Sequence, residues 1–313
     1  MDAVDKGILF ALRTNCRATY QHLGTKLGLT RAAIKKRVDR LIEIGAIQKY
    51  SVELSKEMAN YDCWWIEILT DGSEGSDSFV KMIGAHPMAF VLNRLSGSRY
   101  LVIGHVPGSE GVYDLGRHLR SIDGVISVEM NPLLEVRNRS QGISGQRSVE
   151  RNPGFNRNEF RILRCLTEDA RMPTTEISRR TGISPKVVRR NLNNLQDSGS
   201  ILFTIYMRTS AFGATSFYLK MCLDDCKNDP MEVTERMELG FSHEYWNSWI
   251  VANCSTLIHQ FCAKSIQRIE EIADDVRASN VADSIEVLIK YPNRVFQSYG
   301  RHRLMELLKE NGY

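Results

Sequence analysis

A short sequence pattern occurs twice in this chain, and its two copies lie 154 residues apart without a gap. Residues 5–47 and 159–201 share an acidic start, an apolar ladder and an arginine twelve positions after the start, at Arg17 and Arg171. A glycine recurs in step with them, at Gly28 in the first copy. Chance rarely keeps such residues in register over the whole stretch, so the repeat indicates one structural unit present twice.

Length and composition indicate a globular protein with several domains. The chain has 313 residues, of which 42% are hydrophobic and 25% are charged, and a chain of this size holds about two to four domains. No apolar run approaches the roughly 18 to 20 residues that a membrane span needs. Asp2 and Asp5 stand at the N-terminus in place of an apolar secretory core, so we expect a cytoplasmic protein without membrane contact.

Residues 3–48 predict three short helices followed by a strand. Gly28 suits a tight turn between the second and third helices, because glycine tolerates a positive φ, and Thr30 is a good N-cap for the third helix. Gly45 ends that helix, and residues 47–54 are expected to return past it as a wing. The apolar stripe expected to bury the third helix is Ile34, Val38, Leu41 and Ile42.

The outward faces of the two third helices are basic, although the net charge of the chain is only +4. Such a helix fits the major groove of DNA, where its first outward residues reach base edges and its flanks meet phosphates. The residues expected to contact double-stranded DNA are Thr30, Arg31, Ala32, Lys35, Lys36 and Arg40 in the first copy, and Ser184, Lys186, Arg189 and Arg190 in the second. The simpler alternative is a solvated helix face.

The two basic faces are not the same. In the first copy, threonine and alanine suit base edges, Arg31 and Lys35 suit guanine, and Lys36 suits phosphate, as does the arginine one turn later. Pro185 stands where the first copy has Arg31, and Arg190 stands where it has Lys36. One molecule is therefore expected to recognise two non-identical half-sites.

The segments after each helical unit change rhythm. Residues 62–136 and 215–291 each predict the order strand, helix, strand, strand, helix, strand. This order is the ferredoxin-like βαββαβ plan, in which both helices cover one face of an antiparallel sheet. The other face must be covered too, so we expect association through the sheets, either within one chain or between chains of a homo-oligomer.

The sequence thus predicts an α+β protein with two winged helix-turn-helix domains and two ferredoxin-like (βαββαβ) domains in tandem. The expected boundaries are 1–55 and 159–209 for the helix-turn-helix domains, 60–136 and 213–292 for the ferredoxin-like domains, 137–158 for a linker rich in Ser, Gly, Asn and Arg, and 298–313 for a C-terminal helix.

With these residues in place, the chain resembles the Lrp/AsnC (feast/famine) transcription regulators. The matching residues are Asp5-x-x-Ile8-Leu9-x-x-Leu12, Arg17, Leu23, Leu27-Gly28-Leu29-Thr30, Arg37-Val38-x-x-Leu41, Gly45-x-Ile47 and Tyr50. The resemblance implies a DNA-binding regulator with ferredoxin-like sensor domains that take a small-molecule effector. Members of this family are usually single units that dimerise through the sensor sheets, whereas two units are fused here, which suggests an archaeal source.

The first sensor hairpin departs from the family pattern. The family usually has a glycine followed by an acidic–aromatic–aspartate run, whereas this chain has Gly97, Ser98, Arg99 and Tyr100. Gly97, Ser98 and Tyr100 are the effector-binding candidates that the resemblance implies, and an ordinary hairpin turn is the alternative. The second half has Asn-Cys-Ser at 253–255 and no glycine, so sensing of the family type is less expected there.

Seven cysteines are scattered through the chain, mostly within apolar stretches. This distribution favours buried, reduced thiols over a disulfide framework. A possible metal set comprises Cys222, Cys226, Cys254, His259 and Cys262. Zinc sites usually use tighter Cys-x-x-Cys pairs, so we expect no metal and no cofactor; a redox role stays open.

No phosphate loop, nucleophile elbow or paired-carboxylate motif is present, so no catalytic residue is expected. One enzyme class is the alternative. Siroheme decarboxylases resemble the same winged-helix and ferredoxin-like plan, and bind an acidic tetrapyrrole through basic and histidine side chains. The basic outward helix faces favour DNA binding instead.

Overall fold

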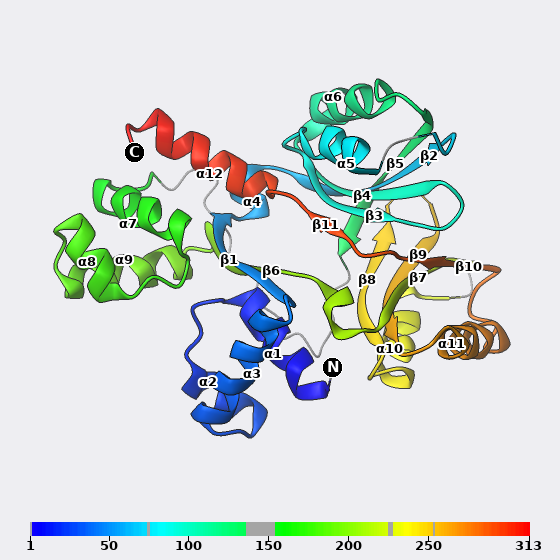
Figure 1. Ribbon diagram of the computed structural model, residues 1–313, viewed down its shortest axis with the longest axis horizontal. Coiled ribbons are helices and arrows are strands. Elements are labelled where there is room, and N and C mark those ends of the chain that lie inside the picture. The colour runs from blue at the N-terminus through cyan, green and yellow to red at the C-terminus, as the bar shows by residue number, and fades with distance from the viewer. Residues whose placement is uncertain (1, 74–75, 136–153, 225–227, 253) are drawn as a thin grey trace. The chain divides into compact units, whose positions relative to one another are not determined.

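The chain folds into two units (Figure 1). The computed structural model describes residues 2–73, 76–135, 154–224, 228–252 and 254–313, so that positions 137–153 of the predicted linker lie outside it. The first unit holds both copies of the repeat and the C-terminal helix, within Met1–Tyr61, Gly145–Arg208 and Gln297–Tyr313. The second unit holds the two sheet-forming segments, within Asp62–Ser144 and Thr209–Phe296.

The first copy of the repeat forms three helices and a strand. They are α1 (Ala3–Thr14), α2 (Tyr20–Leu27), α3 (Arg31–Glu43) and β1 (Ile47–Leu54). Thr30 begins α3 as predicted, since its side chain accepts a hydrogen bond from the Ala33 amide at 3.2 Å. Gly28 ends α2 with a φ of 68°. Ile34, Val38 and Leu41 are buried, but Ile42 is 44% exposed. The expectation for Ile42 is wrong because it lies at the edge of the stripe, in the last turn of α3.

The second copy repeats this order as α7 (Arg157–Glu168), α8 (Thr174–Thr181), α9 (Pro185–Asp197) and β6 (Ile201–Met207). Helix α7 begins inside the predicted linker, because Asn156 and Glu159 form a capping box there. In a capping box the two side chains satisfy each other's free backbone amides, which fixes the first turn. Gly182 ends α8 with a φ of 67°.

Strand β1 pairs with β6 of the other copy, and the two form an antiparallel pair. Tyr50 lies opposite Ile205, and Ser51 lies opposite Thr204. Thr204 is the counterpart of Tyr50 in the repeat, and Ile205 is the counterpart of Ser51. The pair is therefore related by a local pseudo-two-fold axis, and each predicted wing finds its partner in the other copy.

Helix α12 (Tyr299–Glu310) packs on β1, on the short α4 (Lys56–Ala59) and on α7. Arg301 is buried there, and its guanidinium donates to the carbonyl oxygen of Thr167 at 2.6 Å and to that of Val52 at 3.4 Å. Burial raises the pKa of Glu53, on β1, to about 8. Thus α12 binds a strand of the first copy and a helix of the second.

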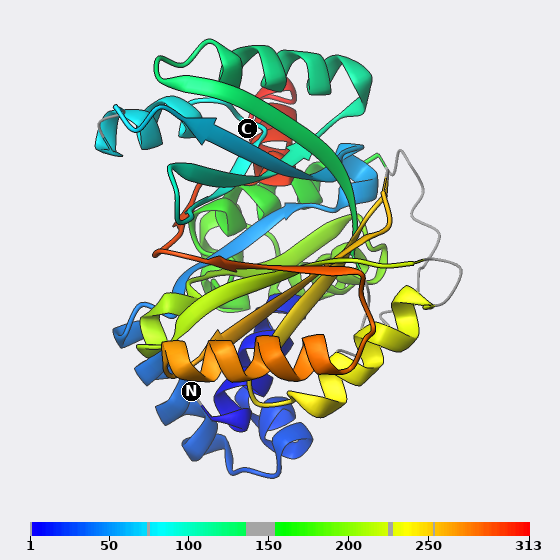
Figure 2. The same ribbon diagram turned by 90° about the vertical axis from the view of Figure 1, so that its right-hand side faces the viewer.

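The two sheet-forming segments each show the predicted βαββαβ order. The first comprises β2 (Asp62–Thr70), α5 (Ser76–Gly84), β3 (Ala89–Arg94), β4 (Arg99–Val106), α6 (Gly108–Arg120) and β5 (Val125–Glu135). The second comprises β7 (Thr215–Cys222), α10 (Pro230–Gly240), β8 (Tyr245–Val251), β9 (Thr256–Ala263), α11 (Ile266–Ala278) and β10 (Ser284–Ile289). Figure 2 shows α10 and α11 beside the strands of the second half. The predicted α+β class is confirmed.

The two halves join into one sheet with the strand order β10-β7-β9-β8-β5-β2-β4-β3-β11, where β11 is Arg294–Val295. Strands β2 and β7 are four places apart in this order, which is roughly 19 Å in a flat sheet. Yet the rings of Trp65 and Tyr218 lie 5.0 Å apart, and Lys220 bonds to Glu67 at 2.6 Å. The faces without helices therefore turn toward each other.

The sequence left open whether the sheets associate within one chain or between chains. The bare sheet faces cover each other within one chain, around a core that includes Trp65, Leu133, Tyr218 and Ile258. The expected homo-oligomer through the sensor domains thus loses the argument on which it rested, and it stays a prediction. Among the described helices, none combines the length and the apolar character that crossing a membrane would require.

Gly300 offers a test of the α12 contact. A Cβ at this position would collide with the backbone oxygen of Leu54, so Gly300→Ala is expected to lower the free energy of unfolding by about 1–3 kcal/mol. Gly240→Ala is the matched control, because its Cβ would meet open space; it should change stability by at most about 1 kcal/mol. Urea unfolding followed by far-ultraviolet circular dichroism measures both, and equal midpoints would contradict the contact.

Candidate nucleic-acid interface

The outward face of α3 carries all six residues predicted from the first copy. Thr30, Arg31, Ala32, Lys35, Lys36 and Arg40 are each exposed. They point outward because Ile34, Val38 and Leu41 hold the opposite face of the helix in the core. The Thr30 oxygen also accepts the cap hydrogen bond, so this side chain begins the helix and stays at the surface.

Nearby carboxylates neutralise part of the charge on α3. Lys35 pairs with Asp39 at 2.8 Å, and Arg40 pairs with Asp5, whose side chain is 1% exposed. Arg37, on the same helix, also reaches Asp5, at 2.9 Å. Within the described part of the chain, Arg31 and Lys36 are the cations of this face that carry no ion pair, and they are the side chains most available to an anion.

The outward face of α9 carries the four residues predicted from the second copy. Ser184, Lys186, Arg189 and Arg190 are all exposed. With Asn193, Asn194 and Asp197, the three basic side chains line a shallow concavity of about 570 Å³. No described carboxylate pairs with these three cations, so their charge is free to meet phosphate.

Two residues of this face were missed by the sequence reasoning. Asn193 and Asn194 are exposed beside the cations, and an asparagine amide can pair with the edge of adenine. Asn193 takes the place of Asp39, and Asn194 takes the place of Arg40. Their spacing of four residues from Arg189 and Arg190 was the signal that could have identified them, since such residues share a helix face.

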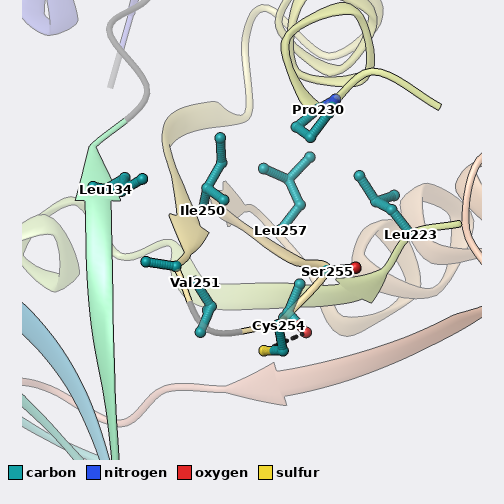
Figure 3. A pocket seen from close by; sticks show the side chains of 10 residues that line it. Leu134, Leu223, Pro230, Ile250, Val251, Cys254, Ser255 and Leu257 are labelled. Atoms are coloured by element: carbon teal, nitrogen blue, oxygen red, sulfur yellow. Dashed lines mark hydrogen bonds between the residues drawn. The ribbon is translucent and has the colours of Figure 1, made fainter. Parts of the chain in front are cut away.

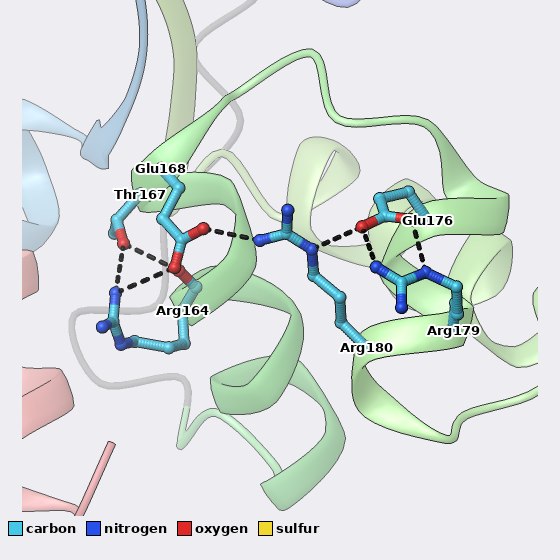
Figure 4. Close-up of polar contacts among 6 residues, drawn as sticks. All are labelled: Arg164, Thr167, Glu168, Glu176, Arg179 and Arg180. Atoms are coloured by element: carbon cyan, nitrogen blue, oxygen red, sulfur yellow. Dashed lines mark hydrogen bonds and ion pairs between the residues drawn. The ribbon is translucent and has the colours of Figure 1, made fainter.

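A second charged group lies on α7 and α8 (Figure 4). Arg180 bridges Glu168 and Glu176 at 2.6 Å each, and Arg179 also pairs with Glu176 at 2.7 Å. Hydrogen bonds from Arg179 and Arg180 lower the pKa of Glu176 to about 2. Exposed pairs of this kind add little stability, but they keep the arginines of this surface neutralised. Among the described residues, Lys186, Arg189 and Arg190 on α9 have no such carboxylate partner.

Two sequence profiles match the chain. A profile described as an AsnC-type helix-turn-helix domain matches residues 1–42, and one described as winged helix-turn-helix DNA-binding matches residues 155–201. An uncharacterised HTH-type transcriptional regulator of Pyrococcus furiosus is 28% identical over 143 residues, which cover 44% of this chain and 94% of that protein. The first helix-turn-helix domain of the chain is therefore of the AsnC type.

Further relatives match over shorter stretches. Another uncharacterised HTH-type regulator of Pyrococcus furiosus is 51% identical over 51 residues, which cover 16% of this chain and 33% of that protein. These archaeal relatives agree with the expected source of the chain. The crystal structure of the siroheme decarboxylase NirDL aligns over 98% of this chain and 97% of its own, with a TM-score of 0.61 and 14% identity. That likeness concerns the fold alone.

Two of the three effector candidates, Gly97 and Ser98, lie in a tight turn. Gly97 and Ser98 both have positive φ values, of 72° and 55°, and the carbonyl oxygen of Ser98 accepts from the Thr70 amide at 3.0 Å. Tyr100 is buried, and its ring packs 4.7 Å from that of Phe79. The structure therefore places Tyr100 in the core, and an effector role for the three residues stays a prediction.

A pocket of about 520 Å³ lies at the hairpin of the second half (Figure 3). Its walls come from the ends of β5, β8 and β9 and from the start of α10. It is lined by Leu134, Leu223, Pro230, Ile250, Val251, Ala252, Cys254, Ser255, Thr256 and Leu257. None of these residues is charged, so the described lining offers no charged partner for the carboxylate or the ammonium group of a free amino acid.

The described cysteines differ in their exposure. Cys16 and Cys165 are buried as expected, but Cys222 and Cys254 are exposed, because one ends a strand and the other lies in a hairpin turn. The His259 side chain is fully buried, and burial lowers its pKa to about 3. No group of three metal-ligating side chains occurs among the described residues, which leave out Cys226.

These environments predict a difference in thiol reactivity. Burial raises the pKa of Cys16 to about 12, so almost no thiolate, the reactive form, is present at neutral pH. Cys222 and Cys254 should react with iodoacetamide in the folded protein, and Cys16 only after denaturant is added. Peptide mass spectrometry resolves each site, and rapid labelling of Cys16 in the folded chain would contradict the burial.

Proposed function

We propose that this chain is a sequence-specific, double-stranded-DNA-binding transcription regulator that carries two different readers in one molecule. The observation that supports this best is the exposure of all ten predicted contact residues on α3 and α9. Both helices follow a glycine-ended helix, as the recognition helix of a helix-turn-helix does. A transcription regulator acts where DNA is, which is consistent with the expected cytoplasmic location.

The two readers differ in how they would contact DNA. On α3, Lys35 and Arg40 already hold carboxylates, so Arg31 and Lys36 meet phosphate or guanine most readily. On α9, the free cations Lys186, Arg189 and Arg190 stand beside two asparagines. The α9 half-site thus has the stronger electrostatic component and a preference for adenine next to phosphate contacts.

We also propose that a small molecule regulates this protein. The uncharged pocket of the second sensor half suits an apolar, uncharged effector better than a free amino acid. The hairpin of the first half, with Gly97 and Ser98, is the other candidate. A homo-oligomer would let the protein bind DNA that carries several sites.

The enzyme alternative rests on the full-length fold similarity to NirDL. A second structure of NirDL holds an iron-uroporphyrin III analogue, and an acidic tetrapyrrole needs several cationic side chains around it. The two pockets described in the sheet unit contain Lys290 as their one charged lining residue. This favours DNA binding over tetrapyrrole chemistry.

Salt-dependent DNA binding tests the proposal. A duplex selected from a random library is titrated at several salt concentrations, and each phosphate contact contributes about 0.9 to the log–log slope. Arg189→Ala with Arg190→Ala should lower the slope by roughly 1 to 2. Arg179→Ala is the control, because this exposed arginine of the same copy is tied to Glu176; its slope should match that of the native chain.

Two results distinguish DNA binding from the enzyme alternative. A slope near zero, or equal losses in the control and the double variant, would overturn DNA binding by α9. Mixing the protein with siroheme tests the alternative, since a bound tetrapyrrole shifts the absorption band, and no shift is expected.

A further inference from the structure

The loops that follow α1 and α7 contact each other across the pseudo-two-fold axis. Arg17 and Arg171 are counterparts in the repeat, and each backbone amide is held by the side chain two residues earlier. Asn15 accepts from the Arg17 amide at 2.9 Å, and Asp169 accepts from the Arg171 amide at 2.8 Å. The two loops therefore have the same local structure, and each directs its arginine toward the other copy.

Arg17 binds the backbone of the second copy. Its guanidinium donates to the carbonyl oxygen of Ala170 at 2.6 Å and to that of Met172 at 3.2 Å, the latter from both terminal nitrogens. These two carbonyls flank Arg171 itself. The planar fork of arginine suits such multiple contacts, whereas a lysine ammonium offers one compact charge.

Arg171 makes the reciprocal contact by a different chemistry. One of its nitrogens lies 3.4 Å from the carbonyl oxygen of Ala18, and its guanidinium lies over the rings of Tyr20 and Tyr50 at 4.8 and 5.2 Å. Cation–π contacts of this kind strengthen as water is excluded. Thr174 and Thr204 stand at the corresponding positions of the second copy. Arg17 therefore has no counterpart of these two tyrosine contacts.

We propose that Arg17 and Arg171 are positioning residues that set the orientation of α3 relative to α9 and thereby fix the spacing between the two half-sites. The inference rests on the proposed DNA-binding function. We call these two side chains and their cross-copy contacts the arginine clasp. The clasp joins the loop between the first two helices of each copy, so it holds the helical bodies themselves.

The strand pair alone does not supply this rigidity. A two-stranded antiparallel ribbon is marginally stable and twists readily, and the β1–β6 register shifts between Ile47 and Lys49. Two further bonds cross at the same place, from the Cys16 amide to Phe203 at 2.7 Å and from the Thr204 hydroxyl to Arg13 at 2.8 Å. Arg17 and Arg171 lie beside these bonds, and each contacts the loop of the other copy.

The charges of the clasp support a role beyond simple packing. Burial and the neighbouring charge of Arg171 both lower the pKa of Arg17, so two like charges are held close together in a partly buried site. Holding like charges together costs free energy. The nearby Asp169, which raises the pKa of Arg17, and the contacted carbonyls and rings offset that cost. Movement of one copy against the other would break this balance.

The first experiment measures binding as a function of half-site spacing. Duplexes carry the two selected half-sites, about one helical turn apart in the reference, with base pairs added or removed between them. The variants are Arg17→Met with Arg171→Met, and the milder Arg17→Lys. Arg161→Met is the matched control, because this arginine bonds to the Thr181 carbonyl within its own copy.

The native chain and the control should share one sharp spacing optimum. The double variant should lose about tenfold in affinity at that optimum, show a flatter spacing profile, and bind an isolated half-site within about twofold of the native chain. An unchanged spacing profile in the double variant would overturn the inference. Equal loss on isolated half-sites would also overturn it, since a folding defect lowers both.

The second experiment needs no DNA. Spin labels are attached through unnatural ketone side chains at Glu43 on α3 and Gln196 on α9, both of which are exposed. The distribution of distances between the two labels is then measured. A distribution broadened in the clasp variants but not in Arg161→Met supports the inference, and equal widths overturn it. If selection yields no bound sequence, the proposed function fails, while the label distances still decide whether the clasp orients the two helices.

Discussion

The antiparallel pairing of β1 with β6 is the contact on which the first unit depends. Each strand closes a three-helix unit, and neither has a strand partner within its own copy. Pairing across the repeat satisfies both sets of backbone groups and relates the copies by a pseudo-two-fold axis. Because a strand pair fixes register but permits twist, the side chains around it decide how firmly the two recognition helices are oriented.

In the second unit, whole sheets of the two halves cover each other, as the single strands β1 and β6 do in the first. Each half has helices on one face and would leave the other face open to water. Strand β5 pairs with β8, and the bare faces then pack through Trp65 and Tyr218. The two halves thus supply this cover for each other within one chain. Fusion also frees the two halves to diverge, because no symmetry operation requires them to stay alike.

That freedom is visible in the charges of the two copies. Asp5 forms ion pairs with Arg37 and Arg40 in the first copy. Glu159, Asn191 and Asn194 stand at these three positions in the second copy. The two arginines that form these ion pairs are thus replaced by two asparagine amides. On α7 and α8, Glu168 and Glu176 neutralise Arg179 and Arg180, whereas no described carboxylate pairs with Lys186, Arg189 or Arg190 of α9. A symmetric dimer could not assign different chemistry to its two readers.

The sequence by itself determined the local elements: the helix caps at Thr30, the glycine that ends α2, the strand and helix order of both sensor halves, and the exposure of the basic helix faces. These depend on residues close together in the chain, where propensity and periodicity act directly. The tertiary structure alone decided the partner of β1, the burial of Tyr100, the exposure of Cys222 and Cys254, and the meeting of Arg17 with Ala170. Each of these depends on segments far apart in the sequence, and periodicity within one segment carries no information about which distant surface will cover it.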